Sequence, residues 1–120
     1  MDDKTNIQQL KEMVKEFCEE RDWDQYHNAK ELAIGIITES GELLQHFRFK
    51  SDAEIDELFK EKCKKQEISE EIADILFFIL RFTQKYHIDI SDEFLKKMRK
   101  NLKHYPVEKS RGRNKKYNEL

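Results

Sequence analysis

The stretch from residue 72 to residue 80 constrains the fold more than any other part of the chain. Its sequence, Ile-Ala-Asp-Ile-Leu-Phe-Phe-Ile-Leu, is apolar nearly all round when it is wound into a helix. Such a helix must be buried on several sides. Helices also dominate elsewhere, because the 120 residues include only 3 Gly and 1 Pro. We therefore predict an all-α fold, a bundle of four to five helices with the length of one domain.

Capping patterns and apolar spacing divide the chain into helices. Thr5 with Gln8, and Ser51 with Glu54, have the spacing of a capping box, and Ser91 is a plausible N-cap. The predicted helices span residues 5–20, 28–49, 51–59, 67 up to a turn at 87–90, and 91–104.

Two further segments lie outside the main helices. Residues 21–27 carry Trp23 and Tyr26 in a polar connection, which indicates either a lid or a packing anchor. Pro106 ends the last long helix, and the basic residues 107–120 would be read as a frayed tail from their composition. We accordingly expect a helical domain over residues 1–106 and a basic C-terminal segment over 107–120 that closes over a site.

Composition excludes several classes of protein. The net charge of −2 gives no field for nucleic-acid binding, and no apolar run reaches the roughly 20 residues that cross a membrane. Cys18 and Cys63 lack the spacing of a zinc site or a disulfide framework. The first residues lack the apolar core of a signal peptide, so we expect a cytoplasmic protein.

Two pairs of acids stand inside the apolar helices. Glu39 and Glu42, and likewise Glu71 and Asp74, are three residues apart, which puts each pair on one helix face. Spacing alone is weak, since 25 acids among 120 residues produce roughly five such pairs by chance. Context is more informative, because Glu39 and Glu71 each continue an apolar stripe and should point toward the core.

Buried carboxylates need a cation, because each unpaired buried charge costs several kcal/mol. If the two helices pack antiparallel, the four acids converge into an oxygen-rich site suited to Mg²⁺, with Mn²⁺ as a substitute, rather than to zinc. The alternative is that Lys or Arg pairs with these acids across an oligomer interface. Gly41 beside the glutamates indicates close approach of another helix or of a ligand. Because four helices of one chain hardly cover residues 72–80, we also expect a homo-oligomer.

At these residues the sequence resembles the MazG-like all-α nucleoside triphosphate pyrophosphohydrolases, and in particular their dCTP pyrophosphatase branch. Residues 39–42 look like the ExxE motif of the family and residues 71–74 like its ExxD motif. Segments 21–27 and 105–117 resemble the upstream and closing segments of the branch. The resemblance covers nearly the whole chain.

The resemblance implies an oligomer, commonly a dimer or tetramer, that holds Mg²⁺ through Glu39, Glu42, Glu71 and Asp74. It implies cleavage between the α and β phosphates of a nucleoside triphosphate, with dCTP or modified deoxynucleotides as the first choice and housecleaning of the nucleotide pool as the role. Glu39 or Glu42 would act as the base. The residues placed against the substrate are His27, Trp23, Phe49, Phe78, Asn101, Lys109, Arg111, Lys115, Lys116 and Tyr117.

Phe49 and Phe78 stand where the eukaryotic dCTP enzymes have Trp and Tyr, so two polar groups that could read the base are missing. Phe47 is a further aromatic candidate for the base pocket. A different class of function stays open beside the enzyme, namely a non-catalytic helical interaction module whose acids form interface salt bridges.

Overall fold

The computed structural model describes residues 1–120 and contains six α-helices, two short 3₁₀ helices and no strand. The prediction of an all-α fold is confirmed. In chain order the elements are α1 (Ile7–Glu20), η1 (Asp24–Tyr26), α2 (Ala29–Gln45), α3 (Asp52–Leu58), α4 (Lys62–Lys85), α5 (Ile90–His104), α6 (Val107–Ser110) and η2 (Tyr117–Glu119).

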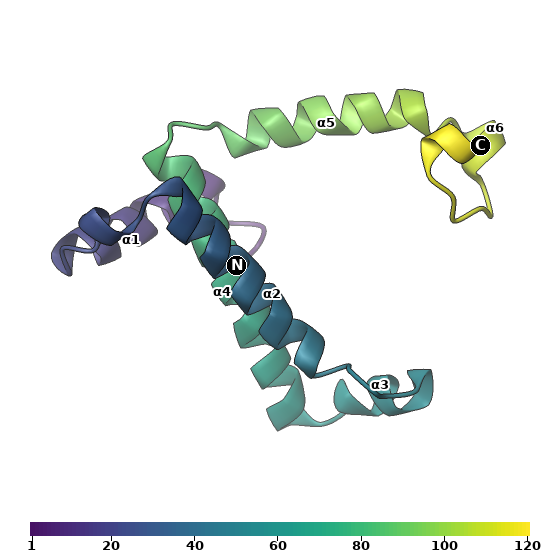
Figure 1. Ribbon diagram of the computed structural model, residues 1–120, viewed down its shortest axis with the longest axis horizontal. Helices are drawn as coiled ribbons and strands as arrows, with labels where there is room; N and C mark the ends of the chain where they lie inside the picture. Colours follow the sequence, from purple (N-terminus) through teal and green to yellow (C-terminus); the bar gives the residue numbers. More distant parts are fainter. The chain divides into compact units, whose positions relative to one another are not determined.

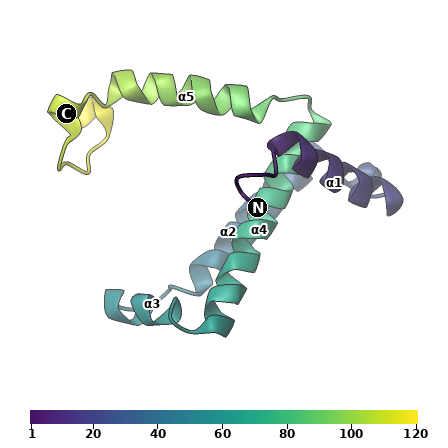
Figure 2. The same ribbon diagram turned by 180° about the vertical axis from the view of Figure 1, so that it is seen from behind.

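Helices α2 and α4 lie side by side and are joined at one end by α3 (Figures 1 and 2). Their contacts show that they run antiparallel. His27, just before α2, bonds to Arg81 near the end of α4, whereas Glu42, near the end of α2, interacts with Glu71 in the first half of α4. This is the packing that the sequence required for its two acidic pairs to converge.

The core forms where α1 and α2 pack on α4. Leu32 of α2 and Ile68 of α4 are almost fully buried. Val14 and Cys18 of α1 form a buried cluster with Leu80 of α4, and the partly buried residues around that cluster are Ile7, Leu10 and Phe77. Burial of these apolar side chains is the main force that holds the three helices together.

Close approach of α2 and α4 depends on Gly35. A methyl group at this position would lie 2.6 Å from the ring of Phe78, which is well inside van der Waals contact. A Cβ at Gly41 would meet nothing within 4 Å. The packing reason that the sequence suggested for Gly41 is therefore absent within one chain, and Gly35 has it instead.

The helix ends differ from the predicted ones in several places. Asn6 with Gln9, rather than Thr5 with Gln8, forms the capping box of α1, because the Asn6 side chain accepts from the Gln9 amide and the Gln9 side chain accepts from the Asn6 amide. The capping box of Ser51 at α3 is confirmed.

Three other boundaries move by a few residues. Helix α2 ends at Gln45 instead of 49, because a turn follows in which Phe49 has a positive φ of 65°. Helix α4 begins at Lys62 instead of 67, since its first charged turn favours helix and faces solvent. Asp89, not Ser91, is the N-cap of α5 and accepts from the Asp92 amide.

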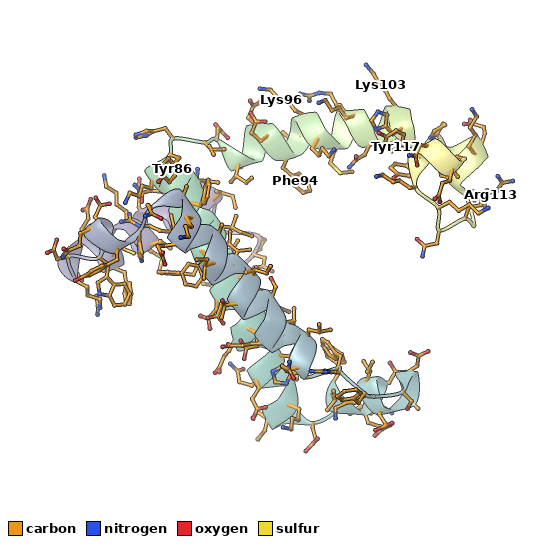
Figure 3. All side chains as sticks on the ribbon, in the orientation of Figure 1. Tyr86, Phe94, Lys96, Lys103, Arg113 and Tyr117 are labelled. Atoms are coloured by element: carbon orange, nitrogen blue, oxygen red, sulfur yellow. The ribbon has the colours of Figure 1, made fainter.

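The chain divides into two compact units, Met1–His87 and Ile88–Leu120. The division after residue 106 that the sequence suggested stays a prediction. Within the second unit α5 is amphipathic, and Figure 3 shows Phe94 on the opposite side of the helix from Lys96 and Lys103. No helix has both the length and the apolar character needed to cross a lipid bilayer.

The C-terminal segment forms short helices, in contrast to the frayed tail that its composition alone would suggest. Residues Val107–Ser110 form α6 after Pro106, and η2 follows. The ring of Tyr117 stacks on His104 with centroids 4.1 Å apart and meets Tyr105 edge-on at 6.1 Å. These aromatic contacts return the end of the chain to the last turn of α5.

Candidate metal centre

Three carboxylates from α2 and α4 converge at one place. One oxygen each from Glu39, Glu42 and Glu71 can be chosen so that all three lie within 4.8 Å of one another. Glu39 and Glu42 are three residues apart on α2, and Glu71 faces them from α4. Glu39 and Glu71 are half-buried, whereas Glu42 is exposed.

Of the three carboxylates, Glu39 shows most clearly that its negative charge lacks a partner. Its Oε2 atom is buried and has no hydrogen-bond partner. Burial, the contact with Glu42, and then the charges of Glu42, Asp74 and Glu71 together raise the pKa of Glu39 to about 7. A carboxylate in this position is costly because its neighbours are also negative.

Glu71 experiences the same environment more mildly. Burial and the neighbouring Glu42 raise its pKa, while its hydrogen bond with Glu39 and the nearby His46 act in the opposite direction. The His46 Nε2 atom lies 3.8 Å from Glu71 Oε1. The half-buried imidazole just beyond α2 therefore lies beside the carboxylate cluster.

The donor set fits a hard divalent cation. All three groups offer carboxylate oxygens, the ligands that Mg²⁺ and Mn²⁺ accept readily. The unpartnered Glu39 Oε2 is the atom that a bound cation would satisfy. The adjacent Ser40 hydroxyl donates to the Ile36 carbonyl at 2.7 Å.

Asp74 lies outside the group of three. Its exposed carboxylate contributes to the raised pKa of Glu39 through its charge, which places it in the neighbourhood of the cluster. The fourth ligand position that the sequence assigned to Asp74 stays a prediction.

The aromatic candidates occupy different positions around α2 and α4. Phe78 packs against Gly35, one helical turn from Glu39, and meets Phe77 edge-on at 5.3 Å. Phe49 follows α2, is 90% exposed, and lies under the Arg48 guanidinium, which is 4.5 Å from the ring centroid. A bulky residue at positive φ is strained and needs a reason.

Phe47 turns toward α3 instead of forming a free platform. Its ring stacks on Phe59 at 6.0 Å with an interplanar angle of 21°. This contact attaches the α2–α3 connection to the end of α3. The suggested role of Phe47 in a base pocket stays a prediction.

His27 and Trp23 lie at the other end of α2. Because a helix rises 1.5 Å per residue, Ala29 at the start of α2 is about 15 Å from Glu39 along the helix axis, and His27 lies beyond that end of the helix. Trp23 packs edge-on against Phe17 at 5.4 Å and lies beside His27, with ring centroids 6.1 Å apart. The segment from 21 to 27 is thus anchored on α1 rather than free.

The remaining substrate candidates belong to the unit Ile88–Leu120. Asn101 is half-buried on α5, where its amide lies 4.0 Å from the Met98 sulfur. Lys109 lies in α6 and Tyr117 in η2. The other basic candidates, all of them exposed, are Arg111, Lys115 and Lys116. Their contact with a substrate stays a prediction.

Two residues of this region were missed by the sequence reasoning. His46 falls within the helix predicted over residues 28–49, and its place in the turn after α2 brings it to Glu71. Arg81 was hidden in an apolar stretch, yet it is 1% exposed and bonds to His27. A charged residue on a buried helix face was the signal available for Arg81.

The comparisons with known proteins agree with this geometry. The model of the MazG-like family matches residues 34–120, which include both acidic motifs and the whole C-terminal unit. The chain belongs to the MazG-like family.

Individual relatives cover most of the chain. The dCTP pyrophosphatase 1 of Rattus norvegicus is 32% identical over 114 residues, 95% of this chain and 67% of that protein. The human dCTP pyrophosphatase 1 is 29% identical over the same shares. The crystal structure of a pyrophosphatase from Archaeoglobus fulgidus matches with a TM-score of 0.77 and 35% identity over 82% of this chain and 91% of the other.

These matches confirm the family and the enzyme class that the sequence predicted, a nucleotide pyrophosphohydrolase. They also disfavour the alternative of a purely non-catalytic interaction module.

Proposed function

We propose that this protein hydrolyses deoxynucleoside triphosphates between the α and β phosphates, with Mg²⁺ held by Glu39, Glu42 and Glu71. One observation carries the proposal: three carboxylates lie within 4.8 Å of one another, and a buried oxygen of Glu39 lacks a partner. Such a cluster is stabilised when a cation occupies it.

The chain supplies distinct roles for the acids. Glu39 and Glu71 are half-buried on facing helices, so their carboxylates would hold a cation in a fixed place. When bound, the cation neutralises the triphosphate and stabilises the charge that develops at phosphorus. Glu42 is the exposed member, so the carboxylate oxygen that it does not offer to the cation can accept the proton of the attacking water. The products are a nucleoside monophosphate and pyrophosphate.

The oxygen ligands favour Mg²⁺, with Mn²⁺ as a substitute. The nearby nitrogen atom that could ligate a metal is His46 Nε2, which lies 3.8 Å from Glu71 Oε1. Titration calorimetry with Mg²⁺ or Mn²⁺ alone should show binding that Glu39→Gln weakens at least tenfold. Binding that is equal in the wild type and Glu39→Gln would contradict this cation site.

The substrate proposal is dCTP or a base-modified deoxynucleotide. Several relatives named dCTP pyrophosphatase 1 align over 95% of the chain. Phe49 and Phe78 offer apolar ring faces without a ring N–H or hydroxyl, which suits stacking rather than hydrogen-bond readout. We therefore expect a modest preference for one base rather than strict selection.

A pyrophosphate-release assay over canonical and base-modified NTPs and dNTPs tests the activity, with phosphorus NMR to identify the products. The wild type should release pyrophosphate only with Mg²⁺ or Mn²⁺, and Glu42→Gln should lower kcat by at least a hundredfold. Glu70→Gln is the matched control, because Glu70 is an exposed neighbour of Glu71 on α4. Its activity should remain within twofold of the wild type.

Two results would reject the proposal. One is inertness of the wild type across the whole panel with either metal. The other is orthophosphate as the first product, because this would mean cleavage at the γ phosphate.

A second copy of the chain is proposed to cover one face of α2. Ile34, Ile37, Gly41 and Leu44 recur at helical spacing, and the three large side chains among them are 44%, 71% and 59% exposed. No atom lies within 4 Å of a methyl group placed at Gly41. An apolar stripe with a flat centre is the kind of surface against which another helix packs.

Exposed apolar residues of α4 also favour packing against a second copy of the chain. Ile72 and Leu76 are 54% and 40% exposed, although the sequence requires this helix to be buried on several sides. Sedimentation velocity should show a dimer or tetramer for the wild type and a smaller species for Ile37→Lys. Glu31→Lys, at an exposed position of the same helix, should leave the sedimentation unchanged. A monomeric wild type at micromolar concentration would contradict the assembly.

A further inference from the structure

Arg81 is a charged side chain buried within the pairing of α4 with the segment before α2. It is 1% exposed, and its guanidinium makes three directed hydrogen bonds. Nε donates to His27 Nδ1 at 3.1 Å, one terminal nitrogen donates to Asp24 Oδ1 at 2.9 Å, and the other donates to Gln84 Oε1 at 2.6 Å. Burial of a guanidinium is tolerated only when its donors are satisfied in this way.

The bond to His27 fixes the chemical state of the imidazole. A guanidinium can donate but cannot accept, so Nδ1 must be unprotonated to receive it. The proton of the neutral ring then resides on Nε2. A doubly protonated ring would lose this bond and place its charge beside a buried cation.

The groups that face His27 favour the neutral ring. Arg81 and Lys85 approach from α4, Asp24 approaches from η1, and the Trp23 ring lies beside the imidazole. Burial, then Arg81, then Lys85 lower the pKa of His27, and Asp24 opposes them. Lys85 also donates to the Asp24 carbonyl at 2.7 Å, which holds the same segment against α4.

The Nε2–H group remains available to a ligand. His27 takes part in side-chain hydrogen bonding through Nδ1. The side-chain atoms that are fully buried and lack a hydrogen-bond partner are Glu39 Oε2 and Ser110 Oγ. The Nε2 atom of His27 is not among them, so it is accessible to a ligand. The Nε2–H group of His27, held in place beside the indole of Trp23, can donate a hydrogen bond to an acceptor on a planar ring.

We propose that Arg81 is a positioning residue that holds His27 neutral with its proton on Nε2, so that His27 donates a hydrogen bond to an acceptor of the nucleotide base. The inference rests on the proposed nucleotide substrate. Ala29 lies about 15 Å along the axis of α2 from Glu39, and His27 lies beyond it, so His27 is remote from the phosphates held near the acids and suits the base.

The state of His27 can be observed directly by nitrogen NMR of the full-length protein labelled at its histidines. His27→Gln identifies the signals of His27 by their loss. In the wild type at neutral pH, Nε2 should resonate as a protonated nitrogen and Nδ1 as an unprotonated one. A ring protonated on Nδ1, or on both nitrogens, would overturn the proposal without any variant.

Two variants separate the hydrogen bond from the nearby charge. In Arg81→Gln the tautomers of His27 should mix and its pKa should return toward the ordinary value of 6.5. In Lys85→Gln the pKa should also rise, but the tautomer should remain, because the Arg81 Nε–H is still present. Equal loss of the tautomer in both variants would show that general disturbance of the segment is responsible.

Kinetics test the effect on the substrate. Arg81→Gln should raise KM about three- to tenfold and leave kcat within twofold, as expected for one neutral hydrogen bond lost from binding. In a His27→Gln background, Arg81→Gln should raise KM no further. A further rise, or an unchanged KM in the single variant, would overturn the positioning role. An inactive wild type would instead reject the proposed function, while the nitrogen signals would still report the state of His27.

Discussion

Replacing Glu39 by Gln should stabilise the metal-free protein, although it removes a proposed ligand. The substitution keeps the shape of the side chain and removes one negative charge from a cluster that contains Glu42 and Glu71. Gln can also donate a hydrogen bond to a neighbouring carboxylate, which Glu39 can do only when it is protonated.

The size of the effect follows from the pKa of Glu39, which rises from an ordinary value of 4.5 to about 7. At about 1.4 kcal/mol per pH unit, this difference corresponds to about 3.5 kcal/mol of repulsion and desolvation at high pH. Water reaches the cluster on the side of the exposed Glu42 and screens it, so we expect about 1 to 2 kcal/mol.

The stability advantage of Glu39→Gln depends on pH within a defined range. Between pH 4.5 and 7 the folded protein keeps a proton on Glu39 that the unfolded chain has lost, so stability falls as pH rises through this range. Above pH 7 the penalty is complete. The advantage of Glu39→Gln should therefore be present at pH 8 and nearly absent below pH 4.5.

Urea denaturation followed by circular dichroism, in the presence of a chelator, measures this difference. Glu70→Gln is the control on α4 and should change the free energy of unfolding by less than about 0.5 kcal/mol at either pH. Saturating Mg²⁺ should reverse the order, because the wild type gains binding energy that Glu39→Gln lacks. An equal advantage of Glu39→Gln at both pH values, or no advantage at pH 8, would refute the reasoning.

Two further predictions concern packing and capping. Gly35→Ala should lower the free energy of unfolding by about 1 to 3 kcal/mol, because its methyl group would overlap Phe78. Gly41→Ala should not lower the stability of the isolated chain. Urea denaturation of both variants tests this, and equal losses of stability would contradict it. Asn6→Ala should cost about 1 kcal/mol in thermal melts while Thr5→Ala costs little, since Asn6 makes the cap. The reverse order would restore the boundary predicted from sequence.

The acidic pairs show what the sequence could predict. The apolar context of the two pairs indicated that their acids face the core, because burying a helix face determines where its side chains point. With the two helices antiparallel, this brings Glu39, Glu42 and Glu71 together. Spacing could not decide which acids come closest. That depends on the rotation of α2 against α4, and Asp74 falls outside the group of three.

The two glycines show why packing was harder to predict. Both stand inside α2, and the sequence drew attention to Gly41 because it lies between the two glutamates. Only the register between α2 and α4 reveals that Phe78 lies over Gly35. The bond between Arg81 and His27 was hidden for the same reason, since periodicity identifies a buried face but not the partner opposite it.

The contact between Gly35 and Phe78 also bears on the radius of the ion that the protein can accept. It lies one turn from Glu39, so it helps to set the width of the gap that the carboxylates span. A larger residue at position 35 would move the helices apart near the acids. Mg²⁺ requires oxygens at about 2.1 Å and Ca²⁺ accepts them at about 2.4 Å, so a small widening shifts the preference toward the larger ion. Discrimination between cations would then depend on a residue that has no side chain and touches no metal.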